Sequence, residues 1–145
     1  MTFEDIVAES AVVVVGEAAA SRVEQTEAGV VTITTFNVED AMVGEPGAIV
    51  EVTTPGGVYT TNGVMVSEAA AGTPIFLVGA EALLFLEEGA AGARQIVGYN
   101  QGAVGVFNTP RGKSVRLPGA DRAETIAEAA ARIRKEKSSP IKKND

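Results

Sequence analysis

The sequence predicts a mainly β protein: a small barrel of five or six strands, preceded by a short helix and followed by an amphipathic helix. Valine, alanine and glycine dominate the composition, and aromatic residues make up only 5% of the chain, a balance that favours short strands over helices. Short apolar runs also alternate with turn signals along the chain. Its 145 residues fit one domain that buries enough apolar surface to fold without disulfides.

The N-terminal residues predict a helix and then a buried strand. Thr2 and Asp5 have the spacing of a capping box, so a short amphipathic helix is expected over residues 2–9. The valine run at 12–15 is β-branched and apolar on both faces, which is typical of a strand buried on both sides. Gly16 marks a bend or bulge at the end of this run.

The next strand is expected over residues 30–43, and its apolar pattern changes parity. Val31 and Ile33 share one face of an extended chain, whereas Phe36 lies on the other. Because a strand alternates its faces, an extra residue near 34–35 is needed to shift the register. We therefore expect a β-bulge there, which lets one strand serve two sides of a barrel.

The remaining strands lie between turn signals. The continuous apolar run at 83–86 predicts a buried strand. Glycines, prolines and an Asn-Gly pair interrupt the chain between residues 54 and 74, which predicts a long irregular connection of the kind that is often functional. Further predicted elements are a turn at 24–29, a strand at 48–53, and a hairpin of 93–99 with 103–107 closed by Asn100-Gln101-Gly102.

The C-terminal segment predicts an amphipathic helix. Asp121 with Glu124 is expected to cap a helix that ends near Lys137. The apolar stripe of this helix consists of Ile126, Ala130 and Ile133.

The order of these elements indicates the arrangement of the whole chain. A helix, about five strands with a bulged second one, and a long loop before the fourth strand follow the order of a five-stranded OB-like barrel. We therefore expect an OB-like β-barrel domain with its N-terminal helix over residues 1–120, a C-terminal helix over 121–137 and a flexible basic tail over 138–145.

Charge is divided along the chain, whose net charge is −7. Arg22 and Arg94 are the only basic residues before residue 111, against fourteen acidic ones, whereas ten basic and five acidic residues follow. The acidic part should repel phosphate backbones, so nucleic acid is an unlikely partner for it. The basic C-terminal segment has two interpretations: it meets an anionic partner, or it lies against its own acidic body.

The composition also limits the chemistry. The chain has no histidine and no cysteine, so the usual general base, thiolate nucleophile and soft metal ligands are missing. The adjacent pairs Glu39-Asp40 and Glu87-Glu88 would point to opposite faces of a strand, which suits solvated strand ends better than a metal site. We therefore expect no enzyme, no catalytic residue, no metal and no cofactor, although Lys113 next to Ser114 leaves Ser–Lys chemistry formally open.

Two exposed polar and aromatic segments are the candidate binding residues. Tyrosine and asparagine offer large contact area and adaptable hydrogen bonds, as binding surfaces commonly do. Ordinary turn chemistry explains the same residues equally simply. The candidates are Tyr59, Thr60, Thr61 and Asn62 on the long connection, and Tyr99, Asn100 and Gln101 in the later turn.

Five segments also stand in a recognisable order. They are the valine-rich strand ending in Gly16-Glu17, then Val43-Gly44, Ile49 to Pro55-Gly56-Gly57, Leu83-Leu84-Phe85-Leu86, and Val97-Gly98-Tyr99-Asn100-Gln101-Gly102. Over residues 2–107 this order resembles a widespread family of uncharacterised bacterial proteins, usually exported. The barrel of that family looks like the inhibitory domain of tissue inhibitors of metalloproteinases and the netrin module.

The resemblance has departures that limit what it implies. The animal inhibitors bind their enzyme's zinc through an N-terminal cysteine, whereas this chain opens with Met1-Thr2-Phe3 and has no cysteine. The bacterial family commonly has a basic residue where Ala103 stands. The resemblance implies a periplasmic or secreted location, with Met1 in place of a removed signal peptide, since no signal peptide and no membrane-spanning apolar run occur in this numbering.

These observations lead to an expected function. The protein is expected to be a non-enzymatic extracytoplasmic binding or interaction module, with a protein or a small polymer as its partner and an inhibitor-like architecture. The alternative is an OB-type binder of single-stranded nucleic acid that uses the basic C-terminal segment. Self-association through the stripe of the C-terminal helix also stays open.

Overall fold

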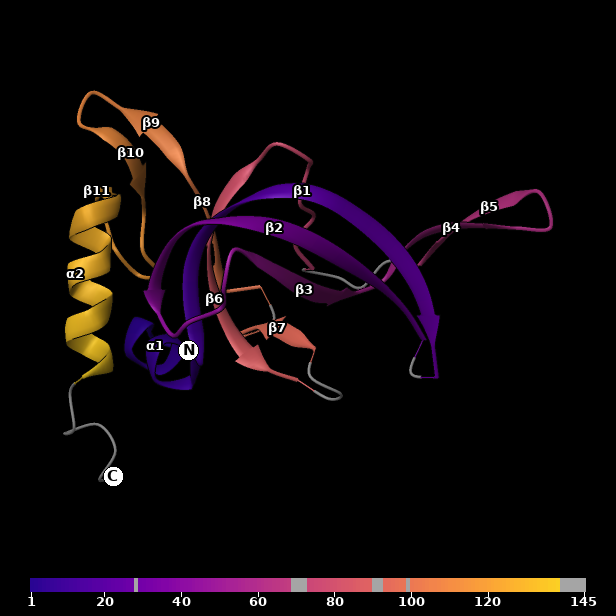
Figure 1. Cartoon of the computed structure of the whole chain (residues 1–145), viewed down its shortest axis with the longest axis horizontal. Helices are drawn as coiled ribbons and strands as arrows, with labels where there is room; N and C mark the ends of the chain where they lie inside the picture. The colour runs from indigo at the N-terminus through magenta and orange to yellow at the C-terminus, as the bar shows by residue number, and fades with distance from the viewer. Residues whose placement is uncertain (28, 69–72, 90–92, 99, 139–145) are drawn as a thin grey trace.

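The computed structural model describes residues 1–27, 29–68, 73–89, 93–98 and 100–138. The fold is mainly β, with a short N-terminal helix, a ring-like sheet and a C-terminal helix, as the sequence predicts (Figure 1). The helices are α1 (Phe3–Glu9) and α2 (Ile126–Lys137); the strands are β1 (Val12–Thr26), β2 (Gly29–Val43), β3 (Ile49–Pro55), β4 (Gly57–Thr61), β5 (Val64–Glu68), β6 (Glu81–Glu88), β7 (Arg94–Ile96), β8 (Ala103–Gly105), β9 (Phe107–Thr109), β10 (Gly112–Val115) and β11 (Glu124–Thr125).

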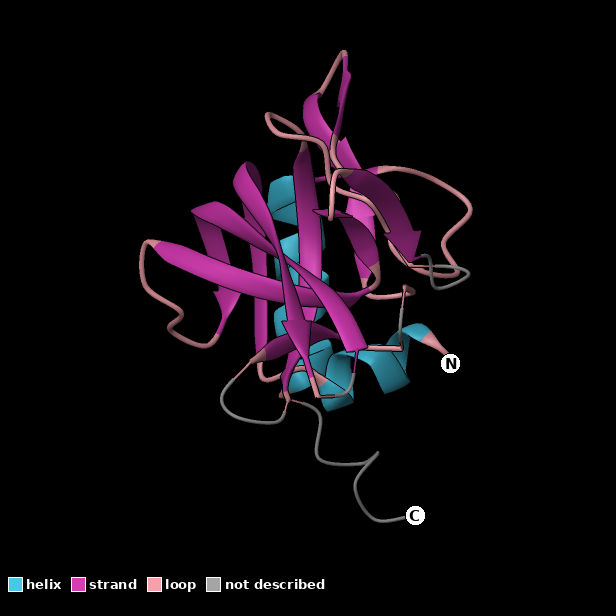
Figure 2. Cartoon of the chain, turned by 90° about the vertical axis from the view of Figure 1, so that its right-hand side faces the viewer, coloured by secondary structure: helices cyan, strands magenta, loops and turns pink. Residues whose placement is uncertain are grey.

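Five strands form the ring. β1 pairs with β2 on one side and with β6 on the other, and the order β1-β2-β3-β7-β6 returns to β1. This order is OB-like. The sheet is near-closed rather than formally a barrel, because a single parallel bridge between Val52 and Arg94 joins β3 to β7. Figure 2 looks from the side of the strands, with the helices behind them.

Strand β1 separates two hydrophobic cores. Val12 and Val14 point into the ring, where they pack around Phe36, whereas Val13 and Val15 point outward toward the helices. All four valines are buried, so the prediction of a strand buried on both faces is confirmed. The outer core also contains Ile6 and Val7 of α1, Leu83 and Phe85 of β6, Val115 and Leu117, and Ala129, Ala130 and Ile133 of α2.

Both helices begin with a capping box. The Thr2 hydroxyl accepts from the Asp5 amide, which confirms the predicted start of α1. The predicted cap of α2 by Asp121 and Glu124 is wrong: Thr125 is the N-cap, and its hydroxyl accepts from the Glu128 amide. The helix starts later because Glu124 and Thr125 are held extended by pairing with β10. Neither described helix is long and apolar enough to cross a bilayer.

The predicted bulge at 34–35 is also wrong, because β2 and β3 pair in regular register from Val31 to Asn37. At this level of the sheet the extra residue lies on β1, where Ala18 pairs with Phe36 and Ala20 with Thr35, leaving Ala19 between them; two further shifts leave Glu39 and Met42 of β2 unpaired. The register shift therefore moves the inward face of β1 from even to odd positions.

The segment between residues 54 and 74 contains a hairpin where an irregular connection was expected. β4 and β5 pair through a two-residue turn, Asn62-Gly63, with φ of 50° and 79°. These values belong to the type I′ turn that Asn-Gly favours.

The predicted hairpin of 93–99 with 103–107 is wrong. β8 pairs with β6 through Leu83–Val104 and its neighbours, and β7 pairs with the other half of β6. β7 and β8 thus lie one after the other along the same side of β6, like two pieces of one interrupted strand.

Candidate functional site

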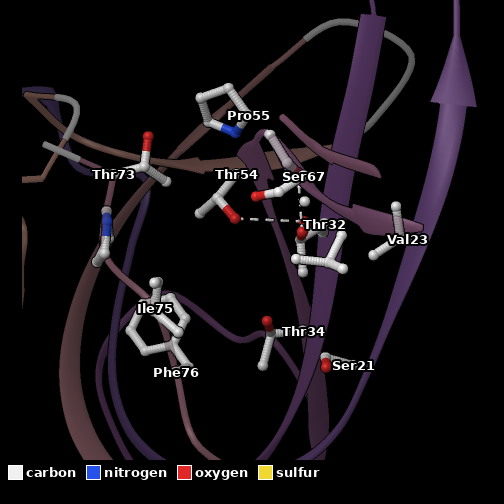
Figure 3. A pocket seen from close by; sticks show the side chains of 14 residues that line it. Ser21, Val23, Thr32, Thr34, Thr54, Pro55, Ser67, Thr73, Ile75 and Phe76 are labelled. Atoms are coloured by element: carbon white, nitrogen blue, oxygen red, sulfur yellow. Dashed lines mark hydrogen bonds between the residues drawn. The ribbon is translucent and has the colours of Figure 1, made fainter. Parts of the chain in front are cut away.

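A cavity of about 300 Å³ opens where the β1–β2 pair extends beyond the ring. The start of the β4–β5 hairpin and the segment before β6 complete its wall (Figure 3). None of its lining side chains carries a charge. The lining residues are Ser21, Val23, Thr32, Thr34, Thr54, Pro55, Gly56, Gly57, Val58, Ser67, Thr73, Pro74, Ile75 and Phe76.

The strand pairing brings the hydroxyl groups together. Ser21 stands opposite Thr34, and Thr32 stands between Val23 on one side and Thr54 on the other. Directly paired residues point to the same face of a sheet, so these side chains form one inward-facing surface. The Ala19 bulge makes this possible, because without it Ser21 and Val23 would face outward.

Phe76 joins the wall of the cavity to the inner core. Phe76 meets Phe36 edge to face, with ring centroids 5.0 Å apart and an interplanar angle of 82°. The segment that carries Phe76 is fastened to β1, since the Gly79 amide donates to the Ala18 carbonyl at 2.8 Å and the Ala18 amide donates to the Ala80 carbonyl at 2.9 Å. The floor of the cavity is therefore aromatic and held in place.

The hydroxyl groups of the cavity differ in their hydrogen bonds. The Thr32 hydroxyl donates to the Gly56 carbonyl at 2.8 Å, and the Thr54 hydroxyl donates to the Thr32 carbonyl at 3.4 Å. Thr34 is only 2% exposed, and its oxygen points into the cavity (Figure 3). Within the described part of the chain, the Thr34 hydroxyl has no hydrogen-bond partner.

Apolar side chains form the rim. Ile75 is 86% exposed and Val58 is 52% exposed, although both line the cavity. Met65 is exposed on the same face of the hairpin as Val58, because its partner Thr60 lies two residues after Val58. Exposed aliphatic groups at the mouth of a cavity provide apolar surface that a partner would bury.

The structure places the predicted binding residues apart from this cavity and from each other. Tyr59 lies on the opposite face of the hairpin from Val58, and Thr61 and Asn62 lie toward its tip. Asn100 and Gln101 are exposed in the turn after β7. In Figure 1, β7, which precedes that turn, lies near the centre, whereas the β4–β5 hairpin lies at the right-hand end. Tyr99 lies outside the described residues.

The hydroxyl groups of the cavity are not among the binding residues that the sequence predicts. The signal was present, because Thr32 and Thr34 alternate with Val31 and Ile33, and alternation decides which residues share a face. In the structure the threonines, and not Val31 or Ile33, line the cavity.

Described basic residues after residue 110 pair with carboxylates in two ways. Lys113 bonds Glu81 of the acidic part at 2.6 Å, whereas Arg132, 3.2 Å from Glu124, and Arg111, which bonds Glu128, pair within the C-terminal segment itself. Arg111, Arg132 and the two glutamates they meet also line a second, charged hollow together with Arg122 and Ala123.

Carboxyl groups near this segment have shifted pKa values. The Lys113 ammonium holds the pKa of Glu81 below its usual value by hydrogen bonding. Burial raises the pKa of Glu39, and the neighbouring Glu81 carboxyl raises it further. The Thr125 amide and then Arg111 lower the pKa of Glu128 by hydrogen bonding.

Among the described residues, no cluster of three histidine, cysteine, aspartate or glutamate side chains could hold a metal ion. Comparison with protein-family models, with curated proteins and with solved structures finds no match to this chain.

Proposed function

We propose that the protein is a non-enzymatic extracytoplasmic binding module, whose partner, a protein segment or a small polymer, inserts one uncharged group into the cavity. The observation that carries this proposal is the Thr34 hydroxyl, which belongs to a buried residue, has no hydrogen-bond partner among the described residues and is directed into a preformed cavity. Binding pockets are typically preformed and mostly apolar, with a few well-placed polar groups. The absence of histidine and cysteine from the sequence supports binding over catalysis.

Two substitutions in the segment before β6 test the proposal. Ile75 and Leu77 are both strongly exposed, at 86% and 72%, but only Ile75 lines the cavity. Ile75→Glu places a charge at the mouth, so it should weaken partner binding, whereas Leu77→Glu should leave it unchanged. Because both side chains are exposed, both variants should keep the wild-type free energy of unfolding.

The measurement is amide chemical-shift mapping of the full chain against a fragment library that contains neutral, anionic and cationic members. The proposal predicts shifts at the amides of the lining residues that weaken in Ile75→Glu only. A library that never shifts these amides, or equal weakening by both variants, contradicts a binding site here. Turnover of any substrate in a hydrolase panel contradicts the non-enzymatic part.

The extracytoplasmic location rests on the resemblance alone. Fractionation of cells that express the native protein tests it, with a periplasmic or secreted signal expected. Recovery from the cytoplasm alone contradicts it. The nucleic-acid alternative has less support, because Arg111, Lys113 and Arg132 are already paired with carboxylates of the same chain.

A further inference from the structure

The lining of the cavity discriminates by charge. Its fourteen residues supply hydroxyl groups, aliphatic groups and one aromatic ring, with no ionisable side chain among them. Moving an ion from water into such surroundings is costly unless an opposite charge or several hydrogen bonds compensate it. The group that enters is therefore expected to be uncharged.

The hydrogen bonds of the hydroxyl groups indicate which polar atom the group carries. The hydroxyl hydrogens of Thr32 and Thr54 are already donated to backbone carbonyls. The Thr34 hydroxyl hydrogen has no acceptor among the described residues. This hydroxyl is open to the cavity rather than sealed from it, so a ligand that supplies an acceptor oxygen at this point gains a hydrogen bond.

The remaining wall indicates an aliphatic body. Val23 and Phe76 flank the position of Thr34, and Val58 and Ile75 extend the apolar surface to the mouth (Figure 3). Gly57 allows this close enclosure, because a Cβ atom there would lie 2.8 Å from the Thr32 hydroxyl oxygen and 3.1 Å from Val23. A compact aliphatic group would bury this surface without leaving a polar group unpaired.

We infer that the cavity binds an uncharged, mainly aliphatic group with one carbonyl-type acceptor, which takes a hydrogen bond from Thr34. This inference rests on the proposed function and names the ligand chemistry of the same site. Two sources supply that chemistry: a small amphiphile with a ketone, ester or amide, or an aliphatic residue of a peptide that presents its backbone carbonyl.

The probes are matched in length and differ in charge. 2-Heptanone, heptanoate and heptylammonium are titrated at pH 7 into the full chain, with amide chemical shifts as the readout. Acetyl-leucine methylamide represents the peptide source. The ketone or the leucine derivative should shift the amides of lining residues and bind at least about tenfold more tightly than either ion, because the ions must shed hydration. Heptylammonium is the control for attraction to the protein surface as a whole, since the net charge of −7 attracts a cation.

Substitutions at residue 34 test the hydrogen bond. Thr34→Val keeps the shape and removes the hydroxyl, so it should weaken binding of the neutral probe by about threefold to tenfold. Thr34→Ser retains the hydroxyl and should restore most of the affinity. Thr61→Val removes an exposed hydroxyl from the hairpin outside the cavity and should change nothing. If Thr34→Val does not fold, the comparison of neutral and charged probes in the wild-type chain still decides the charge preference.

The outcomes separate the two proposals. If 2-heptanone binds more tightly than acetyl-leucine methylamide, a free amphiphile is the better source of the ligand. If the leucine derivative binds more tightly, a peptide is the better source. Ions that bind as tightly as the neutral probes, or a Thr34→Val variant that folds and binds normally, overturn the inference. If library fragments of other chemistry occupy the cavity while both neutral probes fail, the inference is wrong and the binding function stands. If nothing occupies the cavity, both are wrong.

Discussion

At the residue scale, position 102 requires a glycine because backbone atoms of neighbouring strands approach it closely. Gly102 is buried where the two pieces β7 and β8 meet, and its amide donates to the Val97 carbonyl at 2.9 Å. Its carbonyl accepts from the Phe85 amide at 2.8 Å. A Cβ atom at this position would lie 2.8 Å from the Val97 oxygen and 2.9 Å from the Phe85 oxygen. Both obstacles are backbone atoms, so a side chain forces the strands apart.

Gly102→Ala should therefore destabilise the protein by about 1–3 kcal/mol, the usual cost of overpacking. Urea denaturation measures this change in the free energy of unfolding. Gly105→Ala is the matched control on β8, because a Cβ atom there meets nothing within 4 Å; its effect should stay within about 0.5 kcal/mol. Equal losses in the two variants would show that the contact at Gly102 is relaxed at little cost.

The carboxyls of Glu39 and Glu81 make opposite contributions to the dependence of stability on pH. The pKa of Glu81 is lowered by Lys113, so its contribution is present above the ordinary carboxyl pKa and is lost as pH falls through the folded value. The pKa of Glu39 is raised by burial and by Glu81. Its contribution is present at acidic pH and is lost as pH rises through the folded value.

At pH 7, Glu81→Gln is therefore expected to lower the free energy of unfolding, and Glu39→Gln is expected to raise it. Both effects should shrink as pH falls, and the Glu81 effect should persist to lower pH because its folded pKa is the lowered one. Denaturation at pH 7 and at lower pH measures both. Effects of the same sign at neutral pH would contradict the assignment of the two shifts.

At the scale of elements, α2 also completes the end of α1. The last carbonyls of a helix have no partner inside it. The Lys137 ammonium donates to the carbonyls of Val7, Ala8 and Ser10, at 3.2, 3.2 and 2.6 Å. One turn earlier, the Arg134 guanidinium donates to the Met42 carbonyl of β2 at 3.0 Å. Two basic side chains thus attach α2 to distant parts of the chain.

Lys137→Met keeps the aliphatic stem and removes the charge, so it should destabilise the protein by about 1–3 kcal/mol through lost charged hydrogen bonds. Lys135→Met on the same helix is the control, because Lys135 is exposed and its loss should stay within about 0.5 kcal/mol. Thermal or chemical denaturation distinguishes them. If Lys135→Met costs as much as Lys137→Met, the bonds to α1 are not what stabilises this end.

Local signals in the sequence predict some elements and not others. Thr2 with Asp5 and the valine run at 12–15 identify their elements, because the cap and the burial are properties of neighbouring residues. Asn62-Gly63 is an equally local signal for a hairpin. The glycines and prolines around it suggested an irregular connection instead. That β8 pairs with β6 rather than β7 depends on distant residues, and no local pattern contains that information.

The candidate site was harder to predict than the fold for the same reason. An inward threonine is recognised only when the register of three strands is known. Beside the cavity, that register depends on the unpaired Ala19, whose neighbours Ala18 and Ala20 give it no distinguishing pattern.

At the scale of the whole molecule, the strands of the ring are paired unevenly, extensively around β1 and weakly between β3 and β7. β1 pairs with β2 over most of its length and is buried with β6 between the two cores. By contrast, β3 meets β7 only through Val52 and Arg94, with an ion pair between Arg94 and Glu88 at 3.4 Å beside the joint. Opening of the sheet is therefore expected to begin at β7.

Native-state hydrogen exchange tests this order of opening. The central amides of β1 and β6 should exchange only by global unfolding, whereas the amides of β7 should exchange through a smaller, local opening. A gradient of protection from β1 to β7 is the expected result. Uniform protection around the ring would contradict a weak joint and indicate that the sheet opens as one unit.

Both helices lie at the opposite end of the molecule from the β4–β5 hairpin (Figure 1), whose start lines the hydroxyl-rich cavity. The apolar contacts that hold the two helices to β1 and β6 therefore do not involve the cavity wall. Selection could exchange Ser21, Thr54 or Ser67 for other side chains while the scaffold stays intact. With this arrangement, a few substitutions in the cavity lining can change the binding specificity while the rest of the fold is kept.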